Sequence, residues 1–262
     1  MSQRVTVQRD GHVLLIGVNR PEKRNAWDLA TISAVSAAYD ELADDPELRA
    51  GVLFGHGDHF CAGLDLADVS PAVAEHGPGA LSGGGRHDPF GLWNEPVGKP
   101  VVLAVQGIAF TLSIELALAS DIVVTAEDVR FRQLEIGRGI LPFGGATLRA
   151  PAQLGWGNAM RFLLTGEEFG AAEAHRIGLV QEVVPAGHQL ERATELARLI
   201  AAQAPLGVQG TLANARVAQR AESERAAADH LRGLLPGVLA SEDAQEGLRS
   251  FLERREARFT GR

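Results

Sequence analysis

Near its middle the chain reads VQGIAFTLSIELALA, from Val105 to Ala119. The residues just before it, 101–105, are all apolar, which is typical of a strand buried on both faces. That run stops at Gln106-Gly107, a short helix is predicted from about 112 to 119, and another apolar strand follows at 122–125. Strands and helices alternate in this way up to about residue 150, which predicts an α/β fold.

The N-terminal region extends this pattern with a hairpin, a helix and one more strand. Asp10-Gly11 separates two β-branched runs at 5–7 and 13–16, a strong signal for a β-hairpin. Asp28 is a predicted N-cap of a helix that continues to about Leu42. Residues 51–54 read as a buried strand. Residues from about 70 to 94 are rich in Gly, Pro, Ala and His, and we predict a mobile lid or linker there.

The second half of the chain is predicted to be helical. After Gly144-Gly145 helical patterns continue to the end, and the last helix is predicted to begin at an N-cap, Ser241, and to run to about Arg255. We therefore divide the chain into an α/β core, residues 1–200, and a C-terminal helical region, residues 201–262. Composition alone does not show whether that region serves oligomerisation.

Composition excludes several functional classes. The chain has 262 residues, 45% of them apolar, and a net charge of −8, which argues against sequence-independent binding of nucleic acid. Cys61 is the only cysteine, so no intrachain disulfide is expected, and no metal site is predicted. No signal-peptide pattern and no apolar span of about 20 residues is visible, so we expect a cytoplasmic protein without a membrane partner. Scarce lysine and abundant arginine and alanine suggest a GC-rich bacterial genome.

Two glutamates are candidates for acid–base chemistry. At helical spacing Glu115 shares a face with Leu112 and Ala119, so its carboxylate points where an apolar side chain is expected. Burial there would raise its pKa and suit it to proton transfer near neutral pH. Glu135 lies between two large apolar residues in a turn-like stretch. The alternatives are a structural glutamate bonded to backbone amides at 115 and a solvated loop carboxylate at 135.

Two further segments could bind a ligand. Small residues at Ala62 and Gly63 would let a ligand approach the backbone closely, although an ordinary turn explains them equally. Lys23 and Arg24 belong to a basic cluster after the hairpin that could hold phosphates, and a solvated basic turn is the alternative. His56 and His59 flank Asp58, but we interpret that loop as solvated rather than metal-binding.

Taken together, these segments resemble the crotonase (enoyl-CoA hydratase/isomerase) superfamily. Residues 60–66 are similar to its Phe-x-Ala-Gly-x-Asp-Leu stretch, and residues 107–116 to its helix that follows an oxyanion-hole amide. The second Glu follows the first by 20 positions, as in the hydratases. Residues 140–149 look like the family's Pro-x-x-Gly-Gly segment, and similar blocks occur at 164–166, 171–174, 177–180 and 241–251. The resemblance covers nearly the whole chain.

The resemblance implies a crotonase-like spiral of ββα units with a C-terminal α-helical oligomerisation region, assembled as a homotrimer or hexamer. It implies an acyl-CoA substrate and no separate cofactor, since coenzyme A enters with the substrate. The thioester oxygen would be held by the backbone N–H groups of Ala62 and Leu112. The residues implied for CoA binding are Lys23, Arg24, Ala26, Ala62, Asp65, Leu66, Phe251 and Arg255.

By the same resemblance, Glu115 would hold and deprotonate water, and Glu135 would deliver a proton to the α-carbon. Both carboxylates together favour an enoyl-CoA hydratase, which adds water to a trans-2-enoyl-CoA and gives a 3-hydroxyacyl-CoA. The alternatives are an isomerase or another crotonase-type chemistry, or a non-catalytic acyl-CoA-binding protein. One departure stands out: Thr111-Leu112-Ser113 replaces the usual run of glycines, which bears on substrate choice more than on reaction class.

Overall fold

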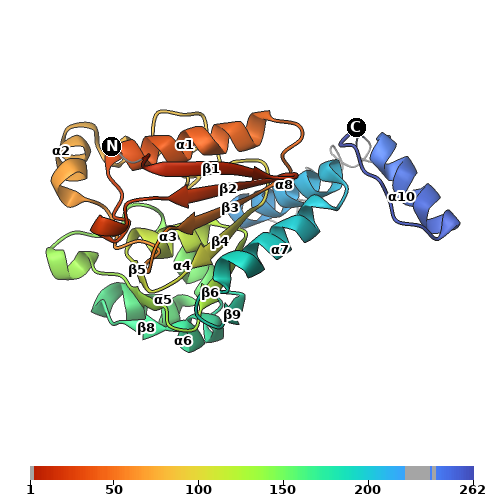
Figure 1. Ribbon diagram of the computed structural model, residues 1–262. Coiled ribbons are helices and arrows are strands. Elements are labelled where there is room, and N and C mark those ends of the chain that lie inside the picture. The colour runs from red at the N-terminus through yellow and green to blue at the C-terminus, as the bar shows by residue number, and fades with distance from the viewer. Residues whose placement is uncertain (1–2, 222–236, 238–239) are drawn as a thin grey trace.

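A six-stranded sheet forms the centre of the computed structural model, which describes residues 3–221, 237 and 240–262 (Figure 1). Its strand order is β1-β2-β3-β4-β6-β9, with β1 and β2 antiparallel and the following pairs parallel. The strands are β1 (Val5–Asp10), β2 (Val13–Val18), β3 (Ala50–Gly55), β4 (Val101–Val105), β6 (Ile122–Ala126) and β9 (Glu182–Val184). The predicted α/β class and hairpin are confirmed, and Gly11 supplies the positive φ of the turn.

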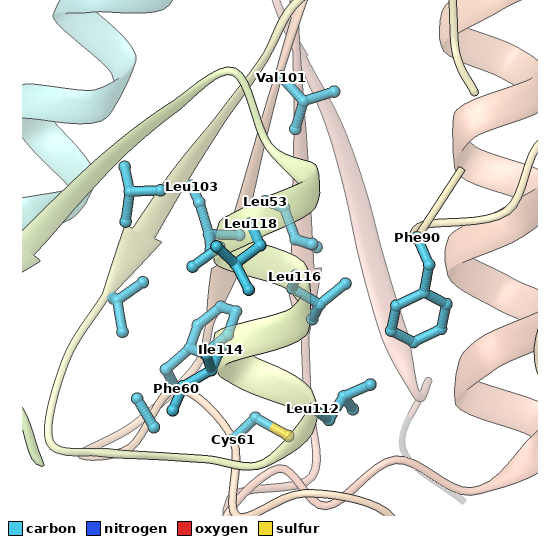
Figure 2. Packing of buried hydrophobic residues seen from close by; sticks show 14 of the residues in the cluster. Leu53, Phe60, Cys61, Phe90, Val101, Leu103, Leu112, Ile114, Leu116 and Leu118 are labelled. Carbon is cyan, nitrogen blue, oxygen red and sulfur yellow. The ribbon is translucent and has the colours of Figure 1, made fainter. Parts of the chain in front are cut away.

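Helices cover both faces of the sheet. Successive side chains of a strand point to opposite sides, so each strand contributes residues to both packed faces. Val52 and Val102 belong to the cluster that packs against the alanines of α7 (Gln189–Ala201). Leu53 and Leu103 face the larger core, beside α3 (Leu112–Ala119), as Figure 2 shows. Strands buried on both faces read as continuous apolar runs, which is why the sequence predicted them well.

Helix α1 (Leu29–Asp44) begins as predicted. The Asp28 carboxylate accepts hydrogen bonds from the backbone N–H of Thr31 (2.8 Å) and from its hydroxyl (2.6 Å). The Asp28 carboxylate thus gives an acceptor to the N–H of Thr31, which has none within the helix.

A second, three-stranded sheet was not predicted. It contains β5 (Ile108–Phe110), β7 (Arg130–Arg132) and β8 (Phe169–Gly170), with β5 parallel to β7 and β7 antiparallel to β8. The prediction of helices alone after residue 145 is also wrong, because β8 and β9 lie there. Strands of two or three residues are too short to display a period of two, so sequence patterns miss them.

The predicted lid or linker at 70–94 contains regular structure and is anchored in the core at Leu81 and at residues 87–90. It contains most of α2 (Leu66–His76) and a 3-10 turn, η2 (Pro78–Ser82). The buried carboxylate of Asp88 then accepts four backbone N–H groups, from residue 90 and residues 92–94. Leu81 and Phe90 are fully buried, so apolar anchors outweigh the glycine-rich composition.

The C-terminal half is mainly helical. Ser241 accepts the N–H of Ala244 (3.0 Å), which confirms the predicted cap of α10. In Figure 1, α10 lies apart from the sheet, beyond the end of α7. The division at residue 200 stays a prediction. No helix among the residues that the structure describes could span a membrane. The helices are α4 (Ala146–Leu154), α5 (Trp156–Thr165), α6 (Ala171–Arg176), α7, α8 (Pro205–Ala221) and α10 (Glu242–Glu253).

Candidate active site

One cavity of about 330 Å³ brings together most of the predicted site residues. Both glutamates line it, one from α3 and one from the 3-10 turn η3 (Glu135–Arg138). Other lining residues come from the turn after the hairpin and from the start of α2. The lining residues are Lys23, Ala26, Ala62, Leu64, Asp65, Leu66, Thr111, Leu112, Glu115, Leu134, Glu135, Arg138, Ile140 and Phe143.

Glu115 is buried and firmly held. Its Oε1 accepts the backbone N–H groups of Gly144 (2.7 Å) and Ala146 (3.3 Å), where α4 begins. Gly144 is required by this approach, because a Cβ there would lie 2.4 Å from Oε2 of Glu115 and 3.1 Å from the ring of Phe90. The amides of the α4 N-terminus therefore fix the carboxylate from behind.

The electrostatics of Glu115 suit proton transfer at neutral pH. Burial, and then the negative charge of Glu135, raise the pKa of Glu115 to about 7, while the two backbone hydrogen bonds and Arg149 act in the opposite direction. A carboxylate with such a pKa is substantially ionised at neutral pH yet basic enough to take a proton.

Glu135 is held less tightly. Gln133, which is fully buried, donates its Nε2–H to Oε1 of Glu135 (3.0 Å). Oε2 is buried and has no hydrogen-bond partner among the described residues. Burial raises the pKa of Glu135, against the effects of hydrogen bonds and the positive charge of Arg138. A raised pKa and an unpartnered oxygen are what a proton donor in a cavity requires.

The amide of Leu112 is free to bind a ligand. Leu112 is the first residue of α3, and its N–H has no partner in the described part of the chain. The first amides of a helix have no intrahelical acceptor and point outward with the positive end of the helix dipole. The structure thus places an available donor where the sequence predicted one.

The prediction for Ala62 is wrong. Its N–H donates to the carbonyl of Arg24 (2.9 Å) and is not available to a substrate. Asp65 N–H is likewise used, by the carbonyl of Trp27 (2.8 Å). Between them, Leu64 lines the cavity, and its N–H has no partner among the described residues. Pairing between residues 24–27 and 62–65 decides which amide is free, and sequence patterns do not show that pairing.

Four of the residues predicted only for CoA binding line the cavity. They are Lys23, Ala26, Asp65 and Leu66, and Asp65 also pairs with Arg20 (3.2 Å). Two others do not line it. Arg24 faces a separate hollow beside Glu22 and Asp58. Arg255 is paired with Glu246 (2.6 Å) in α10.

The remaining prediction, Phe251, lies in α10, but its side chain is outside the described residues. Gln133 and Arg138 were not predicted. The signal that could have found Gln133 is an amide side chain two positions before a candidate catalytic Glu.

No group of His, Cys, Asp and Glu residues in the described part of the structure could hold a metal ion. Cys61 is fully buried, and burial raises the pKa of its thiol to about 12, so it is not a thiolate at neutral pH. The charged side chains among the described residues that line the cavity are Asp65, Glu115, Glu135, Lys23 and Arg138, beside the free backbone amides of Leu64 and Leu112.

Comparison with known proteins agrees with this geometry. A model of the enoyl-CoA hydratase/isomerase family matches residues 8–262. The chain belongs to the enoyl-CoA hydratase/isomerase family. It is 36% identical to an enoyl-CoA hydratase of Mycobacterium tuberculosis over 98% of this chain and 96% of that protein. It is 38% identical to a carnitinyl-CoA dehydratase of Salmonella, over the full length of both.

Solved structures of this family show the same fold. A probable enoyl-CoA hydratase/isomerase from Mycobacterium abscessus is 49% identical, with a TM-score of 0.93 and 99% of each chain covered. An enoyl-CoA hydratase from Mycobacterium tuberculosis is 34% identical, with a TM-score of 0.89 and the same coverage. The crotonase-like fold is therefore confirmed. The relatives' activities differ, so membership of the family does not by itself fix the reaction of this chain.

Proposed function

We propose that this protein is an enoyl-CoA hydratase that adds water to a trans-2-enoyl-CoA. The observation that carries the proposal is the pair of buried glutamates in one cavity, Glu115 and Glu135, each with a raised pKa. Two carboxyl groups whose environments differ can share the work, one as base and the other as acid.

In the proposed reaction the two free amides, those of Leu64 and Leu112, bind the thioester oxygen. Negative charge develops on that oxygen when water attacks the β-carbon, and preorganised N–H groups stabilise the enolate. The two glutamates are proposed to share one proton as a coupled pair, and in the reacting form this proton is on Glu135. Ionised Glu115 removes the proton from the attacking water. Protonated Glu135 then donates its proton to the α-carbon, which gives the 3-hydroxyacyl-CoA. The total number of protons on the two glutamates is the same before and after the reaction. A proton passes from Glu115 to Glu135 before the next turnover.

The coenzyme A part of the bound substrate is proposed to extend out of the cavity between the turn after β2 and the start of α2. Lys23, Ala26 and Leu66 line that side, and the exposed ammonium of Lys23 suits a phosphate. Arg255 does not line the cavity of its own chain, so a role in CoA binding would place it at the cavity of a neighbouring subunit. We therefore also propose a homotrimer or a dimer of trimers. Light scattering that gives a monomer at micromolar concentration would refute this assembly.

Hydration of crotonyl-CoA tests the proposal. Turnover is followed by the loss of absorbance of the conjugated thioester, and the product is identified as 3-hydroxybutyryl-CoA by mass spectrometry. We expect turnover by the parent protein. A product with a moved double bond would indicate an isomerase instead, and tight binding without turnover would indicate a binding protein.

Dehydration of carnitinyl-CoA is a second candidate, favoured only by the identity to the Salmonella dehydratase. The carnitinyl group carries a quaternary ammonium, which proteins bind with several aromatic faces or with anions. Among the described residues that line the cavity, Phe143 is the one aromatic, and the cations Lys23 and Arg138 are accompanied by the carboxyl groups of Asp65, Glu115 and Glu135. A single aromatic face does not form an aromatic cage for a quaternary ammonium. The expected bacterial and cytoplasmic setting stays a prediction.

A further inference from the structure

Thr111 has a backbone conformation that a β-branched residue rarely adopts. Its φ is 49° and its ψ is −103°, close to the second residue of a type II′ turn, a position that glycine normally occupies. It directly precedes Leu112, whose N–H is one of the two proposed oxyanion donors. Strained residues of this kind persist where the surroundings fix them, and they concentrate at functional sites.

The backbone on both sides of Thr111 is fixed. Its N–H donates to the carbonyl of Arg132 in β7 (2.8 Å). Its carbonyl accepts the N–H of Ile114 (2.9 Å) and of Glu115 (3.4 Å) in the first turn of α3. The strained peptide thus joins the second sheet to the helix that carries Glu115, and the direction of the Leu112 amide depends on it.

The side chain of Thr111 contacts the other donor segment. A Cβ built on Gly63 would lie 2.3 Å from the hydroxyl oxygen of Thr111, so this hydroxyl fills the space beside Gly63. Gly63 has a φ of 108° and directly precedes Leu64. Among the described residues, no hydrogen bond from the Thr111 hydroxyl competes with this contact. Thr111 is also the one residue with a side-chain hydroxyl among the described residues that line the cavity.

We propose that Thr111 is a positioning residue that sets the placement of the two backbone donors, Leu64 N–H and Leu112 N–H, relative to each other. Its backbone conformation sets the direction of the Leu112 N–H, and its hydroxyl packs against Gly63, the residue before Leu64. The inference rests on the proposed role of these amides at the thioester oxygen, which any crotonase-type reaction of an acyl-CoA in this cavity would share. It does not require that the reaction be hydration.

The test uses Thr111→Ser, Thr111→Ala and Thr111→Gly. Serine keeps the hydroxyl, alanine removes it, and glycine removes it together with the strain, because glycine tolerates a positive φ. We expect Thr111→Ser to stay within about threefold of the parent, and Thr111→Ala and Thr111→Gly to lose roughly 10- to 100-fold in kcat with little change in KM, since small misplacements of a donor cost this much. Thermal melting should show Thr111→Gly no less stable than the parent.

A spectroscopic readout separates positioning from folding. Hexa-2,4-dienoyl-CoA absorbs further to the red when hydrogen bonds polarise its bound carbonyl. We expect the red shift on binding to be kept in Thr111→Ser and reduced in Thr111→Ala and Thr111→Gly. If both hydroxyl-free variants keep the parent's red shift and kcat, the inference is wrong.

This readout also keeps the inference distinct from the proposed function. A parent protein that fails to hydrate crotonyl-CoA but shows the red shift would refute the hydratase proposal alone, and the variants would still test Thr111. A parent that binds the dienoyl-CoA without any red shift would refute the inference, because the amides would then not act on the carbonyl.

Discussion

Helix α3 and the turn η3 each supply one carboxyl group to the same cavity, but they are built differently. Every residue of α3 from Leu112 to Leu118 is buried, and Figure 2 shows the helix with Leu53 and Leu103 of the large sheet and with Phe90 around it. In η3 only Glu135 is buried, and residues 136–138 are exposed. One carboxyl group is thus part of the core, and the other is held at its edge.

The difference extends to hydrogen bonding. Glu115 has two backbone amides on one oxygen, whereas Glu135 has a single side-chain partner, Gln133, and a buried oxygen without one. Amide donors favour the ionised form of Glu115, and the unpartnered oxygen of Glu135 suits a protonated acid. We infer that the rigidly held Glu115 acts on water and that the less constrained Glu135 donates its proton to the α-carbon.

Removing either carboxyl group should have the largest effect. Glu115→Gln and Glu135→Gln should each lower kcat for crotonyl-CoA by about 10²–10⁴-fold, the usual contribution of a general acid or base. Steady-state kinetics at saturating substrate measures this loss. Near-full turnover in both variants of an active parent would show that the two glutamates are not the catalytic pair.

The support of Glu135 should matter less than Glu135 itself. Gln133→Leu removes the side-chain hydrogen bond to this carboxyl group, so we expect kcat to fall by roughly 10-fold, because one positioning contact is lost. The same hydrogen bond lowers the pKa of Glu135, so the alkaline limb of the pH–rate profile should move to higher pH. Gln153→Leu is a matched control, because Gln153 donates to the Leu118 carbonyl away from this cavity. Equal losses in both variants would argue for a general packing effect.

Burial of Glu115 should lower the free energy of unfolding, and the size of this loss should depend on pH. Its pKa of about 7 in the folded state lies above the value of 4.5 in the unfolded chain, so the folded state binds the proton more tightly between these values. The folded protein therefore loses stability as the pH rises from about 4.5 to about 7. Glu115→Gln should be more stable than the parent at pH 8 by on the order of 1–3 kcal/mol, and the difference should vanish near pH 4.5. Denaturant unfolding at both pH values measures it, and a less stable variant at pH 8 would contradict the assignment.

Substitution of Leu112 should have the smallest effect, which is a change in substrate preference. Its backbone N–H does not depend on the side chain, which lines the cavity and packs in the core. Leu112→Gly should widen the cavity while it weakens the helix start by up to about 1 kcal/mol. We expect the ratio of kcat/KM for a branched and a short enoyl-CoA to rise several-fold. An unchanged ratio, with all substrates slowed alike, would mean that Leu112 mainly holds the amide in place.

The same contrast explains what the sequence could predict. The strands and α3 are long apolar runs, and Glu115 stands out as a charged residue within one of them. Glu135 was a candidate because it lies between two large apolar residues, and its spacing from Glu115 in a known family pattern then supported it. A short turn has no periodicity of its own. The correct second amide, Leu64 rather than Ala62, depends on a pairing of distant segments. The strain at Thr111 is likewise a backbone property that residue identity does not reveal.

Titration of Glu115 with and without the charge of Glu135 shows whether the two carboxyl groups interact as a pair in one cavity. Carbon-13 NMR of glutamate-labelled protein, with Glu115→Gln to assign the signal, would follow this carboxyl group from pH 4 to pH 9. Two coupled acids in one cavity predict a pKa of about 7 for Glu115 in the parent and a lower pKa in Glu135→Gln, because the repelling charge is gone. A Glu115 signal that titrates near 4.5, or one whose pKa is unchanged by Glu135→Gln, would contradict the account.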